Sequence, residues 1–269
     1  MNDNNREFDV IVWGATGFTG RLVAGYLLSR YGADGELRWA LGGRSEDKLV
    51  RIRDELGERG AALPLVTGDS HDAQSMDALA ARTRVVCTTV GPYAKYGSEL
   101  VGACVHAGTH YTDLCGEPQW MRQMIDQHQD AAVASGARIV HACGFDSIPS
   151  DMGVYFLQRE AHERTGGYLG EVRLGVKAMR GGASGGTVAS LMNAVEEGRK
   201  DRTIARVLVH PYSLNPDGER DGPDQRDQQT VVYDGNFDAW TAPFVMAGIN
   251  TKVVRRGHAL RGYPYGRGF

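Results

Sequence analysis

A glycine-rich stretch near the start of the chain has the residue types and spacing needed to hold a dinucleotide. Gly14, Gly17 and Gly20 directly follow the apolar run at residues 8–13. This order predicts a strand, a tight turn and a helix N-terminus, where unpaired N–H groups and the helix dipole favour a phosphate. A Cβ in the turn would hold the pyrophosphate away from the backbone, so glycine suits these positions. We therefore predict that the whole stretch contacts the cofactor: Gly14, Ala15, Thr16, Gly17, Phe18, Thr19 and Gly20. A purely structural glycine turn is the alternative, because a chain with 36 glycines also produces this spacing by chance.

The end of the expected second strand, at residues 37–42, indicates which dinucleotide binds. An acidic residue there accepts from the adenosine ribose and selects NAD, whereas an arginine suits the 2′-phosphate of NADP. The chain continues with Gly43 and Arg44, and Asp34 belongs to a turn before the strand. We therefore predict NADP(H), held at this point by Arg44, Ser45 and Lys48. An arginine that is only a solvated surface charge remains the alternative.

Groups that could transfer a proton follow the expected fourth strand at residues 84–90. Ligands bind beyond the carboxyl ends of the strands near the switch in strand order. On an extended backbone Tyr93 and Lys95 would share a face, and the ammonium group would lower the pKa of the phenol. We predict Tyr93 as the proton donor, tuned by Lys95, although tyrosines in such a loop also serve as packing residues. The residues expected to approach the nicotinamide are Thr89, Val90, Gly91 and Pro92.

Acidic residues lie near the ends of the last two expected strands of this half. Asp113 and Glu117 flank the end of the strand at 109–113, and Asp146 follows the strand at 138–142. All three fall on the edge of the sheet where ligands bind, and Asp146 is the third predicted catalytic residue. Turn and helix-cap roles fit them equally well. The eight histidines are scattered without metal-ligand spacing, so we predict no metal site.

Strand-like apolar runs alternate with helical patterns through the first half of the chain. Unbroken alternation of this kind is typical of an α/β protein with a doubly wound parallel sheet. We predict an NADP-binding Rossmann domain over residues 1–150. The expected strands lie at 8–13, 37–42, 63–66, 84–90, 109–113 and 138–142, with helices after the glycine turn, from Ser45, and near 72–82, 98–107 and 117–135.

The pattern changes after about residue 150. We expect a second, α+β domain over 151–269 that serves the substrate or oligomerisation. Its expected features are a longer strand over 168–179, a glycine cluster at 181–186, a helix over 187–200 and an exposed loop over 213–229. A homo-oligomer is left open.

Composition narrows the function classes. The formal net charge of −3 provides no basic field for nucleic acid or an anionic membrane. Four cysteines without CxxC spacing are typical of thiols in a reducing compartment. No apolar run approaches the ~20 residues of a membrane span, and the N-terminus lacks signal-peptide features, so a cytoplasmic chain is expected. No tyrosine is followed by lysine four residues later, which argues against the Tyr-x-x-x-Lys chemistry of short-chain dehydrogenases.

Five motifs in order resemble the saccharopine dehydrogenase-like oxidoreductases. They lie at 14–20, 40–44, 89–93, 110–117 and 144–151. Segments 184–190 and 250–256 look most like the actinobacterial trans-acting enoyl reductases within that group. The resemblance implies an NADP-type Rossmann domain followed by an α+β domain.

For the enoyl reductase branch, the resemblance implies reduction of a carbon–carbon double bond on a carrier-bound acyl or polyketide substrate, with a polyketide synthase as partner. The alternatives are oxidoreduction at a C–N bond of a small molecule, as the family name suggests, and a non-catalytic protein that senses NADP(H). Relatives continue beyond the position of Phe269, so the second domain is expected to be truncated in this chain.

Overall fold

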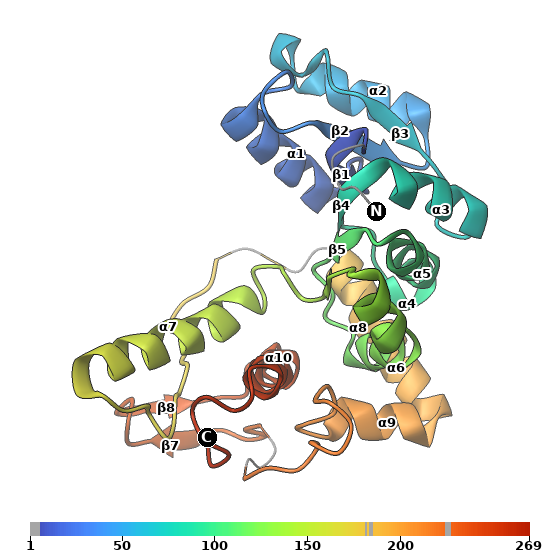
Figure 1. Cartoon of the computed structure of the whole chain (residues 1–269). Helices are drawn as coiled ribbons and strands as arrows, with labels where there is room; N and C mark the ends of the chain where they lie inside the picture. Colours follow the sequence, from blue (N-terminus) through green and yellow to red (C-terminus); the bar gives the residue numbers. More distant parts are fainter. Residues whose placement is uncertain (1–5, 181, 183–184, 224–226) are drawn as a thin grey trace. The chain divides into compact units, whose positions relative to one another are not determined.

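The computed structural model describes residues 6–180, 182, 185–223 and 227–269 (Figure 1). The chain divides into two compact units. The first comprises Met1–Cys115, Gln123–Cys143 and Ser184–Ser190, and the second comprises Gly116–Arg122, Gly144–Ala183 and Leu191–Phe269.

The first unit is built on a six-stranded parallel sheet in the order β3-β2-β1-β4-β5-β6. This order confirms the predicted doubly wound α/β fold. Strands β2 and β3 lie on one side of β1, and β4, β5 and β6 on the other, so the strand order switches between β1 and β4. Doubly wound sheets open a crevice for a ligand at such a switch point. The strands are β1 (Phe8–Trp13), β2 (Trp39–Gly43), β3 (Leu65–Thr67), β4 (Thr83–Thr88), β5 (His110–Thr112) and β6 (Ile139–Val140).

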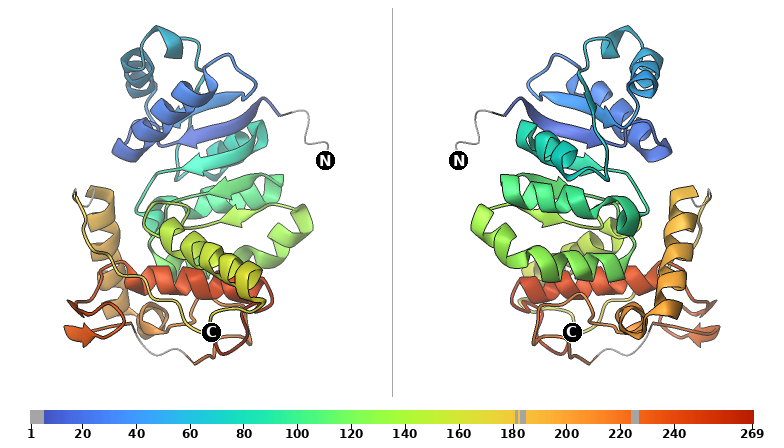
Figure 2. Two further views of the ribbon diagram at one scale, coloured as in Figure 1. Left: turned by 90° about the vertical axis from the view of Figure 1, so that its left-hand side faces the viewer. Right: turned by 90° about the vertical axis from the view of Figure 1, so that its right-hand side faces the viewer.

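Helices cover both faces of this sheet (Figure 2). Figure 1 shows α1 and α3 on opposite sides of β1 and β4. Because both faces are covered, the central strands are continuous apolar runs: Ile11, Val12 and Trp13 are buried, as is all of β2. The helices are α1 (Phe18–Tyr31), α2 (Glu46–Glu55), α3 (Ala73–Arg82), α4 (Tyr93–Tyr96), α5 (Ser98–Ala107) and α6 (Pro118–Ser135), with a 3₁₀ turn at Glu58–Gly60.

The strand boundaries differ slightly from those expected. The third strand begins at Leu65 instead of residue 63, because Pro64 has no N–H to donate to the ladder and contributes only its carbonyl, which accepts from Leu41. The fourth strand ends at Thr88, two residues earlier than expected. The residues after it form the loop that precedes α4, and only the first of them, Thr89, still donates its N–H to β1, at the Trp13 carbonyl oxygen.

The second unit contains mainly helices. They include α7 (Ile148–Thr165), α9 (Arg202–Val209) and α10 (Ala247–Leu260), and β7 (Val232–Asp234) pairs antiparallel with β8 (Ala239–Thr241). Helix α8 (Gly185–Lys200) confirms the helix expected over 187–200. Within the described residues, 213–223 and 227–229 have no helix or strand, in agreement with the expected loop. Of the glycine cluster at 181–186 and the motif at 184–190, residues 181, 183 and 184 lie outside the described part, as do residues 224–226 of the loop.

The long strand predicted over 168–179 is wrong. The segment has an irregular backbone, and no described strand pairs with it, since β7 and β8 pair only with each other. Alternating side chains make a strand feasible, but a strand needs a partner for its ladder. Among the described helices, none is both long and apolar enough to cross a membrane.

Candidate active site

Close packing explains why two of the three glycine positions in the turn between β1 and α1 must be glycine. Gly14 has a φ of +91°, and a Cβ there would lie 2.6 Å from Cγ2 of Val90. A Cβ on Gly20 would lie 2.1 Å from the Gly14 carbonyl oxygen. Neither position can therefore accept a side chain without moving the backbone. The start of α1 is thereby held directly against the ends of β1 and β4.

Gly17 is different, because packing does not require a glycine there. Its φ of −78° and ψ of 167° are open to any residue, and a Cβ would meet only the Gly14 oxygen, at 3.4 Å. It is the N-cap of α1 and, as a glycine, has no side chain with which to cap the first-turn N–H groups. An exposed, uncapped helix start beside a missing Cβ fits the pyrophosphate of a dinucleotide.

The end of β2 lies beside this turn. A Cβ on Gly43 would be 3.7 Å from Cγ2 of Thr16, so the two loops share one edge of the sheet. Arg44 follows at once and is exposed, and no described carboxylate forms an ion pair with it. Ser45 is the N-cap of α2 without a side-chain cap bond, and Lys48 is exposed one turn later. The cationic groups predicted for a 2′-phosphate are thus available at the expected edge.

The loop after β4 is tied to the glycine turn. The Thr89 N–H donates to the Trp13 carbonyl oxygen at 2.9 Å, and its hydroxyl donates to the Gly14 carbonyl oxygen at 3.2 Å. The Val90 N–H donates to the hydroxyl of Thr88 at 3.2 Å, and the Gly91–Pro92 peptide is cis. Four predicted cofactor contacts, Thr89, Val90, Gly91 and Pro92, therefore lie together beside the switch point of the sheet.

The expectation that Lys95 lowers the pKa of Tyr93 is wrong. Residues Tyr93–Tyr96 form a helical turn instead of an extended backbone, so positions 93 and 95 do not share a face. Tyr93 is 3% exposed, whereas Lys95 is exposed. Burial, with the negative charge of Asp113 next in size, raises the pKa of the Tyr93 phenol well above its ordinary value.

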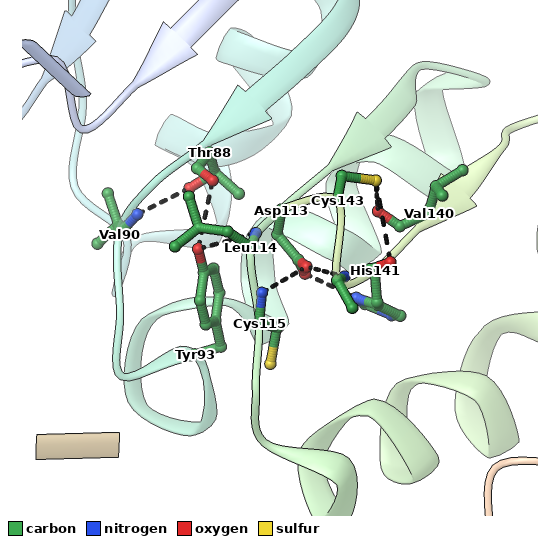
Figure 3. A network of polar contacts seen from close by, with 10 residues as sticks. Thr88, Val90, Tyr93, Asp113, Leu114, Cys115, Val140, His141 and Cys143 are labelled. Carbon is green, nitrogen blue, oxygen red and sulfur yellow. Dashed lines mark hydrogen bonds and ion pairs between the residues drawn. The ribbon is translucent and has the colours of Figure 1, made fainter. Parts of the chain in front are cut away.

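The Tyr93 hydroxyl links the ends of two neighbouring strands through hydrogen bonds. Its hydroxyl donates to the carbonyl oxygen of Thr88 and accepts from the N–H of Leu114, both at 3.3 Å (Figure 3). Thr88 ends β4, and Leu114 follows β5 by two residues. The catalytic role of Tyr93 and Lys95 stays a prediction. The loop does not, however, lower the pKa of the Tyr93 phenol toward neutral pH.

A buried carboxylate–imidazole pair lies beside this loop, and its histidine was not among the residues expected to be catalytic. Asp113 Oδ2 and His141 Nδ1 are 2.7 Å apart, with 0% and 6% of the two side chains exposed. Asp113 Oδ1 accepts from the N–H group of Cys115 at 2.9 Å (Figure 3) and from that of Ala142, also at 2.9 Å. Ala142 has a φ of +59°, a backbone conformation that residues other than glycine rarely adopt.

The sheet register explains why these two side chains meet. Thr112 is opposite Val140 in the β5–β6 pair, so the residues that follow them emerge side by side at the carboxyl edge. The signal in the sequence was a carboxylate, Asp113, as the last residue of the expected strand at 109–113 and a histidine, His141, within the next expected strand at 138–142. Reading it required the parallel register of β5 and β6.

Asp146 is exposed in the turn before α7 and belongs to the second unit. Its catalytic role stays a prediction. Within the described ranges, no group of three or more His, Cys, Asp or Glu residues is arranged to hold a metal ion.

Comparison with known proteins finds similarity to one family of NADP-binding domains. Residues 10–140 match the family described as saccharopine dehydrogenase NADP binding domain. Over the whole chain, the sequence is 44% identical to a protein of Mycobacterium tuberculosis named as a trans-acting enoyl reductase, and 40% identical to one of Mycobacterium leprae. The chain spans 65% of the length of each of these relatives. Apo saccharopine dehydrogenase from Saccharomyces cerevisiae aligns at 15% identity and a TM-score of 0.45, over 59% of this chain and 32% of that one.

Proposed function

Because residues 10–140 match the saccharopine dehydrogenase NADP binding domain, we propose that the protein is an NADPH-dependent reductase of a carbon–carbon double bond conjugated to a carbonyl. The observation that carries this proposal is the 44% identity, over the whole chain, to a protein named as a trans-acting enoyl reductase. The α/β unit supports it through a glycine turn that fits a pyrophosphate and through Arg44 at the end of β2, which forms no ion pair with a described carboxylate.

Three groups of residues would hold the cofactor. The N–H groups at the start of α1, around Gly17, receive the pyrophosphate. Arg44, with Ser45 and Lys48, receives the 2′-phosphate through charge-assisted hydrogen bonds. The loop from Thr89 to Pro92 borders the nicotinamide end. When bound, NADPH supplies the hydride.

The substrate we propose is an α,β-unsaturated acyl thioester carried by a polyketide synthase, because the similar mycobacterial proteins are named as trans-acting. Conjugation matters because hydride addition at the β-carbon leaves negative charge on the carbonyl oxygen and the α-carbon. The protein must then hold the substrate away from water and deliver one proton to the α-carbon.

The test is NADPH consumption with a matched substrate panel. The panel contains 2-enoyl thioesters of N-acetylcysteamine, the corresponding saturated thioesters, and a keto acid with an amino acid for C–N chemistry. We expect consumption only with the enoyl thioesters and one saturated product per NADPH. NADPH consumption with the keto acid and the amino acid instead would contradict the proposal and indicate that the protein acts on C–N bonds. Tight NADPH binding without turnover of any substrate would favour a sensor. The Gly17→Val variant serves as the cofactor-deficient control.

A further inference from the structure

We propose that His141 is the proton donor of this reaction and that Asp113 is its positioning residue. The inference rests on the proposed function and names the group that completes it. It replaces the tuned phenol of Tyr93 as the source of the proton. The two side chains lie 2.7 Å apart at the carboxyl edge of the parallel sheet.

The hydrogen bonds around Asp113 fix which imidazole nitrogen carries the hydrogen. Its Oδ1 already accepts from the N–H groups of Cys115 and Ala142, so its Oδ2 is the oxygen turned to His141. A carboxylate oxygen accepts, so Nδ1 of His141 donates to it. The carboxylate thus sets the tautomer and the ring orientation, and Nε2 becomes the nitrogen that exchanges protons.

Backbone hydrogen bonds also join the two segments that carry Asp113 and His141. The Cys143 N–H donates to the Asp113 carbonyl oxygen at 2.7 Å, and the Asp113 N–H donates to that of Val140 at 3.3 Å. The Tyr111 ring and the imidazole form a T-shaped pair, with ring centroids 5.8 Å apart and an interplanar angle of 69°. Ala142 keeps its uncommon φ of +59° within this set of bonds. A backbone held in a rare conformation is a frequent mark of a functional site.

The strand order places the pair on the nicotinamide side of the crevice. A dinucleotide lies across the switch point, here between β1 and β4. Arg44 at the end of β2 fixes the adenosine half on one side of that point. The nicotinamide half then extends over the ends of β4, β5 and β6, where Tyr93, Asp113 and His141 are found.

The step balances without another reactant. After the β-carbon has received the hydride, the former π electrons lie on the α-carbon and the carbonyl oxygen as an enolate. The Nε2–H bond of the His141 imidazolium breaks, a C–H bond forms at the α-carbon, and neutral imidazole remains. A new proton from the solvent then restores Nε2–H, while Asp113 keeps its hydrogen bond with Nδ1 throughout.

Ring nitrogen NMR tests the pairing without any turnover. In long-range ¹H–¹⁵N spectra of the neutral ring, with His141 assigned by its loss in His141→Gln, we expect the Nδ1–H tautomer. In Asp113→Asn the amide oxygen must still accept from Cys115 and Ala142, so the amide N–H₂ faces Nδ1 and forces the hydrogen onto Nε2. An Nε2–H tautomer in the parent protein, or the same tautomer in both proteins, overturns the proposal.

Turnover of an enoyl thioester tests the role itself. We expect His141→Gln and Asp113→Asn to lower kcat by about 10²–10⁴-fold, with NADPH affinity within twofold. The matched control is His110→Gln, at the opposite end of β5, where the ring accepts from the Arg138 N–H. Undiminished kcat in His141→Gln, or an equal loss in His110→Gln, overturns the assignment.

The two proposals fail in different ways. If the parent protein binds NADPH but reduces no enoyl thioester, the proposed function fails, and the donor role with it. If the parent reduces enoyl thioesters and His141→Gln does so equally well, only the donor role fails.

Discussion

Replacing Tyr93 by phenylalanine removes a buried hydroxyl that joins the ends of two neighbouring strands. The ring stays and keeps its packing, so the change removes the hydroxyl together with its hydrogen bonds to Thr88 and Leu114. The variant separates two interpretations of this residue. A catalytic phenol would affect turnover, whereas a brace would affect the free energy of unfolding.

The structure sets the expected size of the stability effect. Both bonds are 3.3 Å long, beyond the common range, so each contributes at the low end, about 0.5–1 kcal/mol. Their sum lowers the free energy of unfolding by about 1–2 kcal/mol. For a chain of this size that corresponds to a Tm lower by roughly 2–8 °C. Turnover should change by less than about tenfold, because the loop shifts but the pair of Asp113 and His141 remains.

Thermal unfolding and steady-state kinetics on the same preparations measure both quantities. Tyr26→Phe is the matched control, since Tyr26 is 62% exposed on α1 and should change neither Tm nor kcat. A Tyr93→Phe protein with an unchanged Tm and a kcat lower by about 10²–10⁴-fold would refute the bracing interpretation and restore Tyr93 as the donor.

Three further predictions concern the first unit. Arg44→Ala should weaken NADPH binding by about 1.5–3 kcal/mol and leave NADH binding unchanged; equal losses for both in a fluorescence titration would refute the phosphate contact. Gly17→Val should abolish NADPH binding at an unchanged Tm, whereas Gly20→Ala, whose Cβ would lie 2.1 Å from a carbonyl oxygen, should lower the Tm strongly. The hydrogen bond from Arg38 lowers the pKa of Asp9 in the folded protein. The ionised Asp9 side chain therefore stabilises the fold fully above its unfolded-state pKa of about 4, and this stabilisation is lost as the pH falls through the lower pKa of the folded state. Asp9→Asn should therefore flatten the acid limb of stability against pH, and an unchanged limb in denaturant titrations would contradict this.

The order of elements in the first unit follows from local patterns because parallel strands covered on both faces must be continuously apolar. A run such as 8–13 can therefore be recognised as a strand from its own residues, before the neighbouring strands are known. The segment at 168–179 shows the limit of the same reasoning. Alternation there permits a strand, but only the fold decides whether another strand lies beside it, and no described strand does.

The candidate site was predictable where chemistry resides in one loop. The glycine turn and Arg44 each lie within a few consecutive residues, so spacing alone locates them. Tyr93 was misread because the direction of its side chain depends on whether residues 93–96 are extended or helical. The partnership of Asp113 and His141 could not be read from spacing, since the two are 28 residues apart and meet only through the register of β5 and β6.

Asp113 has two physical tasks, and this decides which of its variants are informative. Through Oδ1 it ties the residues after β5 to those after β6, and through Oδ2 it orients His141. Alanine would remove both, leaving the N–H groups of Cys115 and Ala142 without this acceptor, so a loss of activity would say nothing about the imidazole. Asparagine keeps the acceptor and reverses only the hydrogen bond to Nδ1. If the two tasks are separable, Asp113→Asn keeps the fold and the affinity for NADPH while turnover falls, and that combination is what a positioning carboxylate requires.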